Sequence, residues 1–133
     1  MTLQEREDYA CAIIDSMAEK LRDVSLYLHD NPELGLNEHK AVKVINQFLE
    51  THNFTSQVGL TDLPELQTAL RGDYNGTAQH KIAFLGEYDA LPELGHGCGH
   101  NLIAMMSLGA AIAFSQSAPE AWGTTFFGCP AEE

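Results

Sequence analysis

The sequence is short of basic residues and of long apolar runs. Its 133 residues hold seven Lys and Arg against nineteen Asp and Glu, a formal net charge of −12. Nucleic acids and anionic membranes attract clustered positive charge, so the composition argues against both as partners. No apolar run approaches membrane-spanning length, and the start MTLQERED is acidic, whereas a secretory signal begins basic and continues apolar. We therefore expect a cytoplasmic protein.

Cysteine is also scarce. Cys11, Cys98 and Cys129 are odd in number and far apart, so a disulfide framework is not expected. Cys11 falls inside a helical pattern, and we expect it to be a small buried apolar side chain. The sequence has no internal repeat and no low-complexity tract, and 44% of it is hydrophobic. One globular domain with a real core fits these values.

Two helices are expected in the first half of the chain. Thr2 and Glu5 have the spacing of a capping box, and apolar residues at helical spacing follow. This helix should end by Asn31, because the proline after it disfavours an α conformation. A second amphipathic helix is predicted at about 39–52, and a short strand at 54–58.

Further strands are expected in the middle of the chain, after a loop at 61–67. Asn-Gly at 75–76 lies between two strand-like runs, 68–74 and 78–85, and predicts a hairpin. The apolar run at 82–85 is typical of a strand that is buried on both faces.

The last third of the chain predicts a β-α-β crossover. A strand near 81–87, an apolar helix near 102–116 and a strand near 123–128 follow in this order. Such a unit makes its two strands parallel neighbours or near-neighbours, which gives an α/β fold with a mixed sheet and flanking helices. We expect the strand at 123–128 to lack some neighbours and to leave an edge prone to association.

The crossover brings two groups of chemically active residues together. Asp89, Cys98 and His100 follow the first strand, and Glu132 and Glu133 follow the second. Ligand sites of open parallel sheets lie beyond the carboxyl ends of the strands. Both groups should therefore meet at one edge of the sheet.

Cys98 and His100, separated by one glycine, have the spacing of a short chelate loop. Thiolate and neutral imidazole are zinc ligands, and imidazole also suits manganese, cobalt or nickel. A glycine-rich turn whose side chains point elsewhere is the alternative. His96 alternates with both residues and is either a third ligand or a group that packs and hydrogen-bonds behind them.

The paired glutamates have two interpretations. In extended chain one carboxylate can hold a metal while its neighbour reaches a water as general base. A solvated acidic terminus is the other interpretation of Glu132 and Glu133. Asp89 is either a ligand-orienting residue or an ordinary turn aspartate before a proline.

A cysteine hydrolase, with Cys98 as nucleophile and His100 as base, is a different class of function. Two residues so close in sequence, however, rarely meet in hydrogen-bonding geometry.

At these residues the sequence resembles the amidohydrolase branch of the M20 metallopeptidase family, which includes aminobenzoyl-glutamate hydrolases and M20-domain dipeptidases. The matching segments occur in the family's order over most of the chain. They are NPELG at 31–35 with Glu38, EYDALP at 87–92, GHGCGHNL at 95–102 and PAEE at 130–133.

The resemblance implies a role for each candidate. Cys98, His100 and Glu133 would be ligands of divalent metal ions, zinc or manganese, with two ions in the complete enzyme. Glu132 would be the general base of a metal-activated water that attacks an amide bond, and Asp89 would support the centre from behind. Substrates would be dipeptides or N-acyl amino acids with a free carboxylate.

The resemblance implies that residues 1–133 are the amino-terminal part of a catalytic domain with a zinc-peptidase-like fold. Family members continue past PAEE with further histidine ligands and an inserted dimerisation domain, so a homodimer is expected of the full-length form only. We expect the 133 residues alone to be weakly active or inactive; a non-catalytic metal-binding module is the alternative. Cys129 stands where this branch more often has Thr or Gln. Its thiol would either compete for the metal ion or simply pack against neighbouring side chains.

Overall fold

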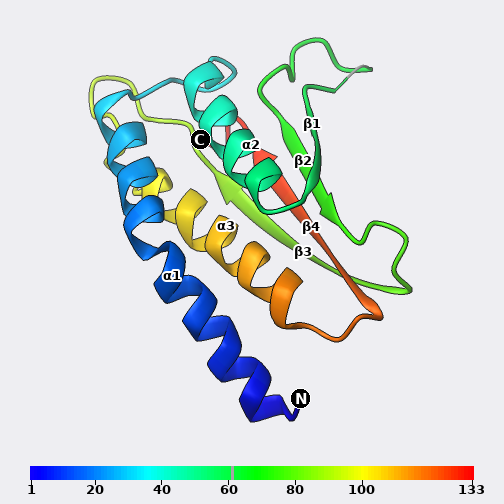
Figure 1. Ribbon diagram of the computed structural model, residues 1–133. Coiled ribbons are helices and arrows are strands. Elements are labelled where there is room, and N and C mark those ends of the chain that lie inside the picture. Colours follow the sequence, from blue (N-terminus) through cyan, green and yellow to red (C-terminus); the bar gives the residue numbers. More distant parts are fainter. Residues whose placement is uncertain (61) are drawn as a thin grey trace.

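The computed structural model describes residues 1–60 and 62–133 and contains three helices and four strands in this part of the chain (Figure 1). They are α1 (Leu3–Asp30), α2 (His39–Thr51), β1 (Thr55–Val58), β2 (Leu70–Tyr74), β3 (His80–Glu87), α3 (His100–Ser117) and β4 (Trp122–Cys129). The predicted mixed α/β fold is confirmed. Thr61, the first residue of the predicted loop, lies outside the described residues.

Both amino-terminal helices begin and end where local chemistry predicts. The capping box is present, because the Glu5 amide donates to Thr2 Oγ1 at 3.2 Å and the Thr2 amide donates to Glu5 Oε2 at 2.6 Å. α1 ends at Asp30, before the proline. α2 covers 39–51, one residue short of its predicted end.

The four strands form one sheet in the order β1-β2-β4-β3. β3 and β4 pair in parallel, with Glu87 opposite Cys129 at their carboxyl ends. The remaining pairs, β1 with β2 and β2 with β4, are antiparallel. α3 connects β3 to β4, so the predicted crossover is confirmed.

The predicted hairpin at 75–76 is wrong. β2 and β3 are not paired, because β4 lies between them. The turn itself forms, with Asn75 at a φ of 52°. The side-chain nitrogen Nδ2 of Asn75 donates to the backbone carbonyls of Glu120 and Trp122 at 2.9 and 3.2 Å. The turn therefore anchors the start of β4 instead of joining two paired strands.

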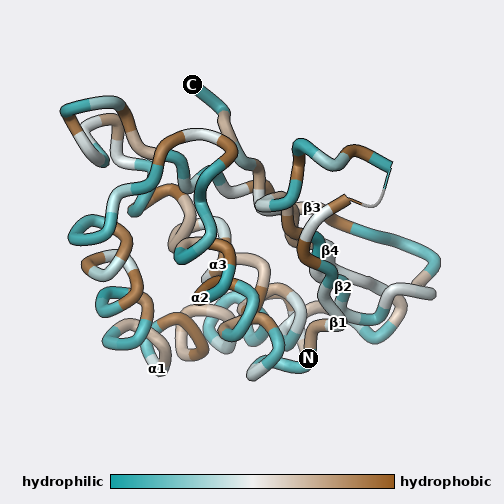
Figure 2. The backbone as a smooth tube through the Cα atoms, turned by 90° about the horizontal axis from the view of Figure 1, so that it is seen from above, coloured by the Kyte–Doolittle hydropathy of each residue, from teal (hydrophilic) through white to brown (hydrophobic). Residues whose placement is uncertain are grey.

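The sheet is covered on one face. α2 and α3 pack against the strands and α1 packs on α3, so the helices gather on one side of the sheet in Figures 1 and 2. Lys81, Ala83 and Leu85 of β3 are consequently exposed. The expectation that 82–85 is buried on both faces is wrong for this reason. The expected edge at 123–128 is also wrong, since β4 lies between β2 and β3, and β1 and β3 are the edge strands.

The core lies between the sheet, α2 and α3. Ile45, Leu49, Leu108, Ile112 and Phe126 have no exposed surface. Gly86 allows α3 to approach β3 closely, because a Cβ there would lie 3.3 Å from the Ala104 Cα. Cys11 is exposed on α1, so its predicted burial is wrong. Within residues 1–60 and 62–133, no helix is both long and apolar enough to cross a membrane.

Candidate metal centre

The carboxyl ends of β3 and β4 bring the two predicted groups together. The chain leaves β3 at Glu87 and β4 at Cys129, which are register partners. After β3 it passes through Asp89 and a loop to Gly99, whose φ of 87° is in the left-handed region that glycine adopts without strain. α3 begins at the next residue, His100. The first turn of α3 therefore faces the segment that follows β4.

His100 is buried and held by Asp89. Its Nδ1 lies 2.9 Å from the Asp89 backbone carbonyl. The same nitrogen is 3.1 Å from Asp89 Oδ1, although that oxygen makes no aligned hydrogen bond with any residue that the structure describes. Because a carbonyl only accepts, this contact assigns the proton to Nδ1 and leaves Nε2 with a free lone pair. Nε2 is the nitrogen that faces Glu132 and Glu133, at 3.3 and 4.0 Å.

Cys98, His100 and Glu133 form one cluster of three possible ligands. One donor atom of each lies within 4.8 Å of the donor atoms of the other two. Thiolate, imidazole and carboxylate together suit a zinc-like ion. No Lys or Arg of the described residues forms an ion pair with Asp89, Glu132 or Glu133. The converging negative groups have no positive partner there, so a bound cation fits this donor set.

The paired glutamates both face His100. Glu132 Oε2 is the nearer, at 3.3 Å from Nε2. The Glu133 amide donates to Asp89 Oδ2 at 3.1 Å, which fixes the backbone between the two carboxylates. Both side chains are partly exposed, 49% and 39%, so they face solvent from the rim of the cluster. All five predicted site residues thus lie at one sheet edge.

His96 and Cys129 lie outside the cluster. The run from His96 to His100 is a tight turn and not the extended chain that the alternation assumed. His96 is buried, and its Nδ1 has no hydrogen-bond partner among the described residues. Burial and the neighbouring His100 and His29 lower its pKa. Burial and the charge of Glu87 raise the pKa of the Cys129 thiol, and its Sγ lies 3.8 Å from the Phe127 carbonyl. Burial therefore favours the uncharged thiol at Cys129.

The site depends on residues to which the sequence alone assigned no role. Glu33 caps α2, because its carboxylate accepts from the amides of Lys40 and Ala41 at 3.0 and 2.9 Å. Its own carbonyl accepts from the Ala90 amide at 2.8 Å and so anchors the loop after Asp89. The only indication of a role for Glu33 in the sequence was its place in the family segment NPELG.

The start of α3 is anchored in the same way. The Asn101 side chain donates to the Ser25 backbone carbonyl and Oγ at 3.3 and 3.1 Å, which joins α3 to α1 beside His100. Asn101 is buried, so this contact is shielded from water.

Comparison with known proteins supports the family resemblance that the sequence motifs indicate. No family model matches the chain. The mouse protein Xaa-Arg dipeptidase is 37% identical over an alignment of 131 residues that covers 90% of this chain and 30% of the relative. A subunit of the p-aminobenzoyl-glutamate hydrolase of Escherichia coli is 30% identical and covers 98% of this chain. A solved dinuclear metal-binding peptidase of the M20 family from Bacillus subtilis superposes with a TM-score of 0.74 at 26% identity over 89% of this chain.

The chain belongs to the M20 family. It spans about a third of the length of the curated relatives it matches, 30% of the dipeptidase and 31% of the hydrolase subunit. It covers 36% of the solved M20 peptidase.

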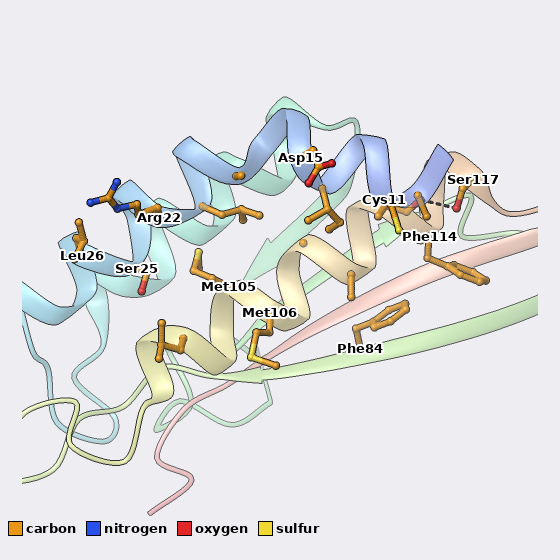
Figure 3. Close-up of a pocket in the computed structure, with 18 residues that line it drawn as sticks. Cys11, Asp15, Arg22, Ser25, Leu26, Phe84, Met105, Met106, Phe114 and Ser117 are labelled. Carbon is orange, nitrogen blue, oxygen red and sulfur yellow. Dashed lines mark hydrogen bonds between the residues drawn. The ribbon is translucent and has the colours of Figure 1, made fainter. Parts of the chain in front are cut away.

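The M20 chain also has a hollow that is separate from the cluster. It has a volume of about 980 Å³ and is lined by residues of α1 and α3, among them Met105 and Met106, and by Phe84 of β3 (Figure 3). Its lining is almost entirely apolar and includes neither Cys98 nor Glu133. Metal ligands and groups that transfer protons are polar, so the candidate site is the edge of the sheet at the carboxyl ends of β3 and β4 and not this hollow.

Proposed function

We propose that these residues are the amino-terminal part of the catalytic domain of an M20 metal-dependent amidohydrolase that cleaves dipeptides or N-acyl amino acids. The observation that supports this most is the meeting of the Cys98, His100 and Glu133 donor atoms within 4.8 Å. The resemblance to a dipeptidase and to an aminobenzoyl-glutamate hydrolase favours amide bonds as the target.

Cys98, His100 and Glu133 would hold a divalent ion, zinc or manganese, with a second ion bound in the complete enzyme. Such an ion lowers the pKa of a water and polarises a carbonyl. The backbone carbonyl of Asp89 accepts a hydrogen bond from the Nδ1–H of His100, so Asp89 orients the ring and leaves Nε2 facing the cluster. The Glu132 carboxylate lies at the cluster's rim, where it would take a proton from the attacking water and pass it to the leaving amine.

The substrate would be a small molecule with a free carboxylate. We also propose that the 133 residues alone turn over weakly or not at all, since they span only about 30% of the dipeptidase they resemble. A homodimer is proposed for the full-length form only. A cytoplasmic location, without nucleic-acid or membrane partners, remains the prediction from the acidic composition.

The cysteine-hydrolase alternative is less well supported. Among the described residues no hydrogen bond joins Cys98 Sγ to a His100 nitrogen. Instead, Nδ1 of the His100 ring contacts the Asp89 carbonyl, and Nε2 faces the carboxylates of Glu132 and Glu133.

Metal binding and hydrolysis should be measured on one preparation. Zinc and manganese affinities are determined by chelator competition for wild type, Cys98→Ser and Cys11→Ser. Cys11 is exposed on α1 and serves as the matched thiol control. We expect wild type and Cys11→Ser to bind alike, and Cys98→Ser to bind about 10-fold or more weakly.

Turnover of dipeptides and N-acyl amino acids is then assayed with and without chelator. Any hydrolysis should be weak, should need metal, and should fall about 100-fold or more in Glu132→Gln while metal stays bound. Bound metal without any turnover would favour the non-catalytic module. Hydrolysis that survives chelator and disappears in Cys98→Ser would support the cysteine hydrolase, and strong chelator-sensitive turnover would overturn the proposed weakness of the isolated chain.

A further inference from the structure

Glu38 is a buried carboxylate outside the three-ligand cluster. It has no exposed surface and lies immediately before α2. Its side chain forms no capping bond to the helix. Instead it points toward the end of β4, where Oε1 accepts from the Ala131 amide at 2.8 Å. The carboxylate therefore contacts the backbone one residue before the paired glutamates, although 93 positions separate Glu38 from Ala131 in sequence.

The backbone at Ala131 needs such support. Ala131 has a φ of 51°, in the left-handed region that an L-residue with a Cβ adopts at a cost. This turn redirects the chain after Pro130 so that Glu132 and Glu133 face His100. Gly35 packs directly against it, because a Cβ at that position would lie 2.9 Å from the Ala131 Cβ. Gly35 thus packs against the turn, and Glu38 accepts a hydrogen bond from it.

A second set of buried groups fixes Glu38 itself. Thr68 is fully buried, and its hydroxyl donates to Glu38 Oε2 at 2.6 Å. The Thr68 carbonyl in turn accepts from the hydroxyl of Tyr88, which immediately precedes Asp89. Buried polar groups that are all hydrogen-bonded hold one geometry, because any rearrangement leaves a group unpaired. We call Glu38, Thr68, Tyr88 and Ala131 the buried network.

We infer that Glu38 is a positioning residue of the metal centre. By holding the Ala131 amide it fixes the left-handed turn, and the turn places the Glu132 and Glu133 carboxylates beside His100. This inference rests on the proposed function, since it assigns Glu38 a purpose in the same site. It concerns this chain's backbone, however, and can be tested without turnover.

The test compares four variants with wild type. Glu38→Ala removes both acceptors. Glu38→Gln is the conservative variant: its amide oxygen can accept from Ala131, and its amide nitrogen can donate to the Thr68 hydroxyl, which also accepts. Leu49→Ala, a core truncation on the same helix and remote from Ala131, controls for lost stability. Thr68→Val removes one donor and keeps the side-chain shape, in case Glu38→Ala does not fold.

Two readouts are taken on each folded variant. Zinc affinity by chelator competition should fall about 10- to 100-fold in Glu38→Ala. It should fall in the same direction, by less, in Thr68→Val, and should stay close to wild type in Glu38→Gln and Leu49→Ala. Hydrogen exchange of the Ala131 and Glu133 amides in metal-free protein should accelerate in Glu38→Ala more than in Leu49→Ala.

The outcomes separate the two proposals. If wild type binds zinc through Cys98 but Glu38→Ala and Leu49→Ala bind it equally well, the metal centre stands and the positioning role is refuted. If wild type binds no zinc, the proposed function fails, and the exchange rates alone decide the role of Glu38. Unchanged exchange at Ala131 in Glu38→Ala and in Thr68→Val would refute the inference in either case.

Discussion

Tyr88→Phe removes one oxygen atom from the buried network and should destabilise the protein measurably. Tyr88 has no exposed surface, and its hydroxyl donates to the Thr68 carbonyl. The phenylalanine ring fills the same space but leaves that carbonyl without a donor. An unpaired buried acceptor of this kind costs about 1–3 kcal/mol. For a chain of 133 residues, the average unfolding entropy converts this into a decrease in Tm of roughly 4–11 °C.

The effect also has a defined pH dependence. Burial raises the pKa of Tyr88 strongly, and the charges of the Glu38 carboxylate, of the Cys129 thiol once it ionises and of the Asp89 carboxylate raise it further. A group whose pKa is higher in the folded state stabilises that state fully below its unfolded pKa, and this stabilisation is lost as the pH rises. The difference in stability between wild type and Tyr88→Phe should therefore be constant up to about pH 10, the ordinary tyrosine pKa, and shrink above it.

Thermal unfolding followed by circular dichroism measures the change, with urea unfolding as a second method. Tyr74→Phe is the matched control, because the Tyr74 ring packs on Phe54 while its hydroxyl has no hydrogen bond to any described residue. Its free energy of unfolding should change by less than about 0.5 kcal/mol. Equal stability of the two variants would refute the reasoning, since it would mean that the Thr68 carbonyl does not depend on Tyr88.

Three further changes test other parts of the fold by urea unfolding. Glu33→Ala removes the cap of α2 and should cost about 1 kcal/mol; no loss would show that water replaces the carboxylate. Leu108→Ala leaves a cavity at a fully buried position of α3 and should cost about 3 kcal/mol, whereas the same change at the exposed Leu102 should cost little. Burial raises the pKa of Asp73, but hydrogen bonds from Arg71 and Thr125 and the charges of Arg71 and Lys81 lower it more, so the net pKa lies below its ordinary 3.8. The ion pair therefore stabilises the fold above that pH, and this effect is lost as the pH falls through the lowered pKa. Asp73→Asn should consequently cost about 1 kcal/mol or less at pH 7 and a smaller amount at pH 2; an equal loss at both pH values would contradict this.

Local patterns predicted the elements well because their causes are local. The capping box of Thr2 and Glu5, the proline that ends α1 and the strand-helix-strand order of the last third all depend on neighbouring residues. The convergence of Asp89, Cys98, His100 and the paired glutamates followed from the crossover alone. Parallel strands joined by one helix leave their carboxyl ends side by side.

The errors occurred where a distant segment decides the outcome. Asn-Gly at 75–76 is a good turn signal, but only the placement of β4 determines that β2 and β3 do not pair. The apolar run at 82–85 could not indicate that one face of β3 is uncovered. Glu38 has the appearance of a surface acid before a helix, and its burial depends on a contact with Ala131, which is 93 positions away in sequence.

The position of β4 has a consequence for synthesis on the ribosome. β4 is made after the other three strands, yet it is the one that joins the β1–β2 pair to β3. Until residues 122–129 emerge, β3 lacks the strand it pairs with and β2 has only β1. Nascent chains would therefore expose open strand edges up to that point, which is when pairing with another chain is easiest. The pairing of these four strands and the arrival of Glu132 and Glu133 beside His100 then coincide, because the same segment does both.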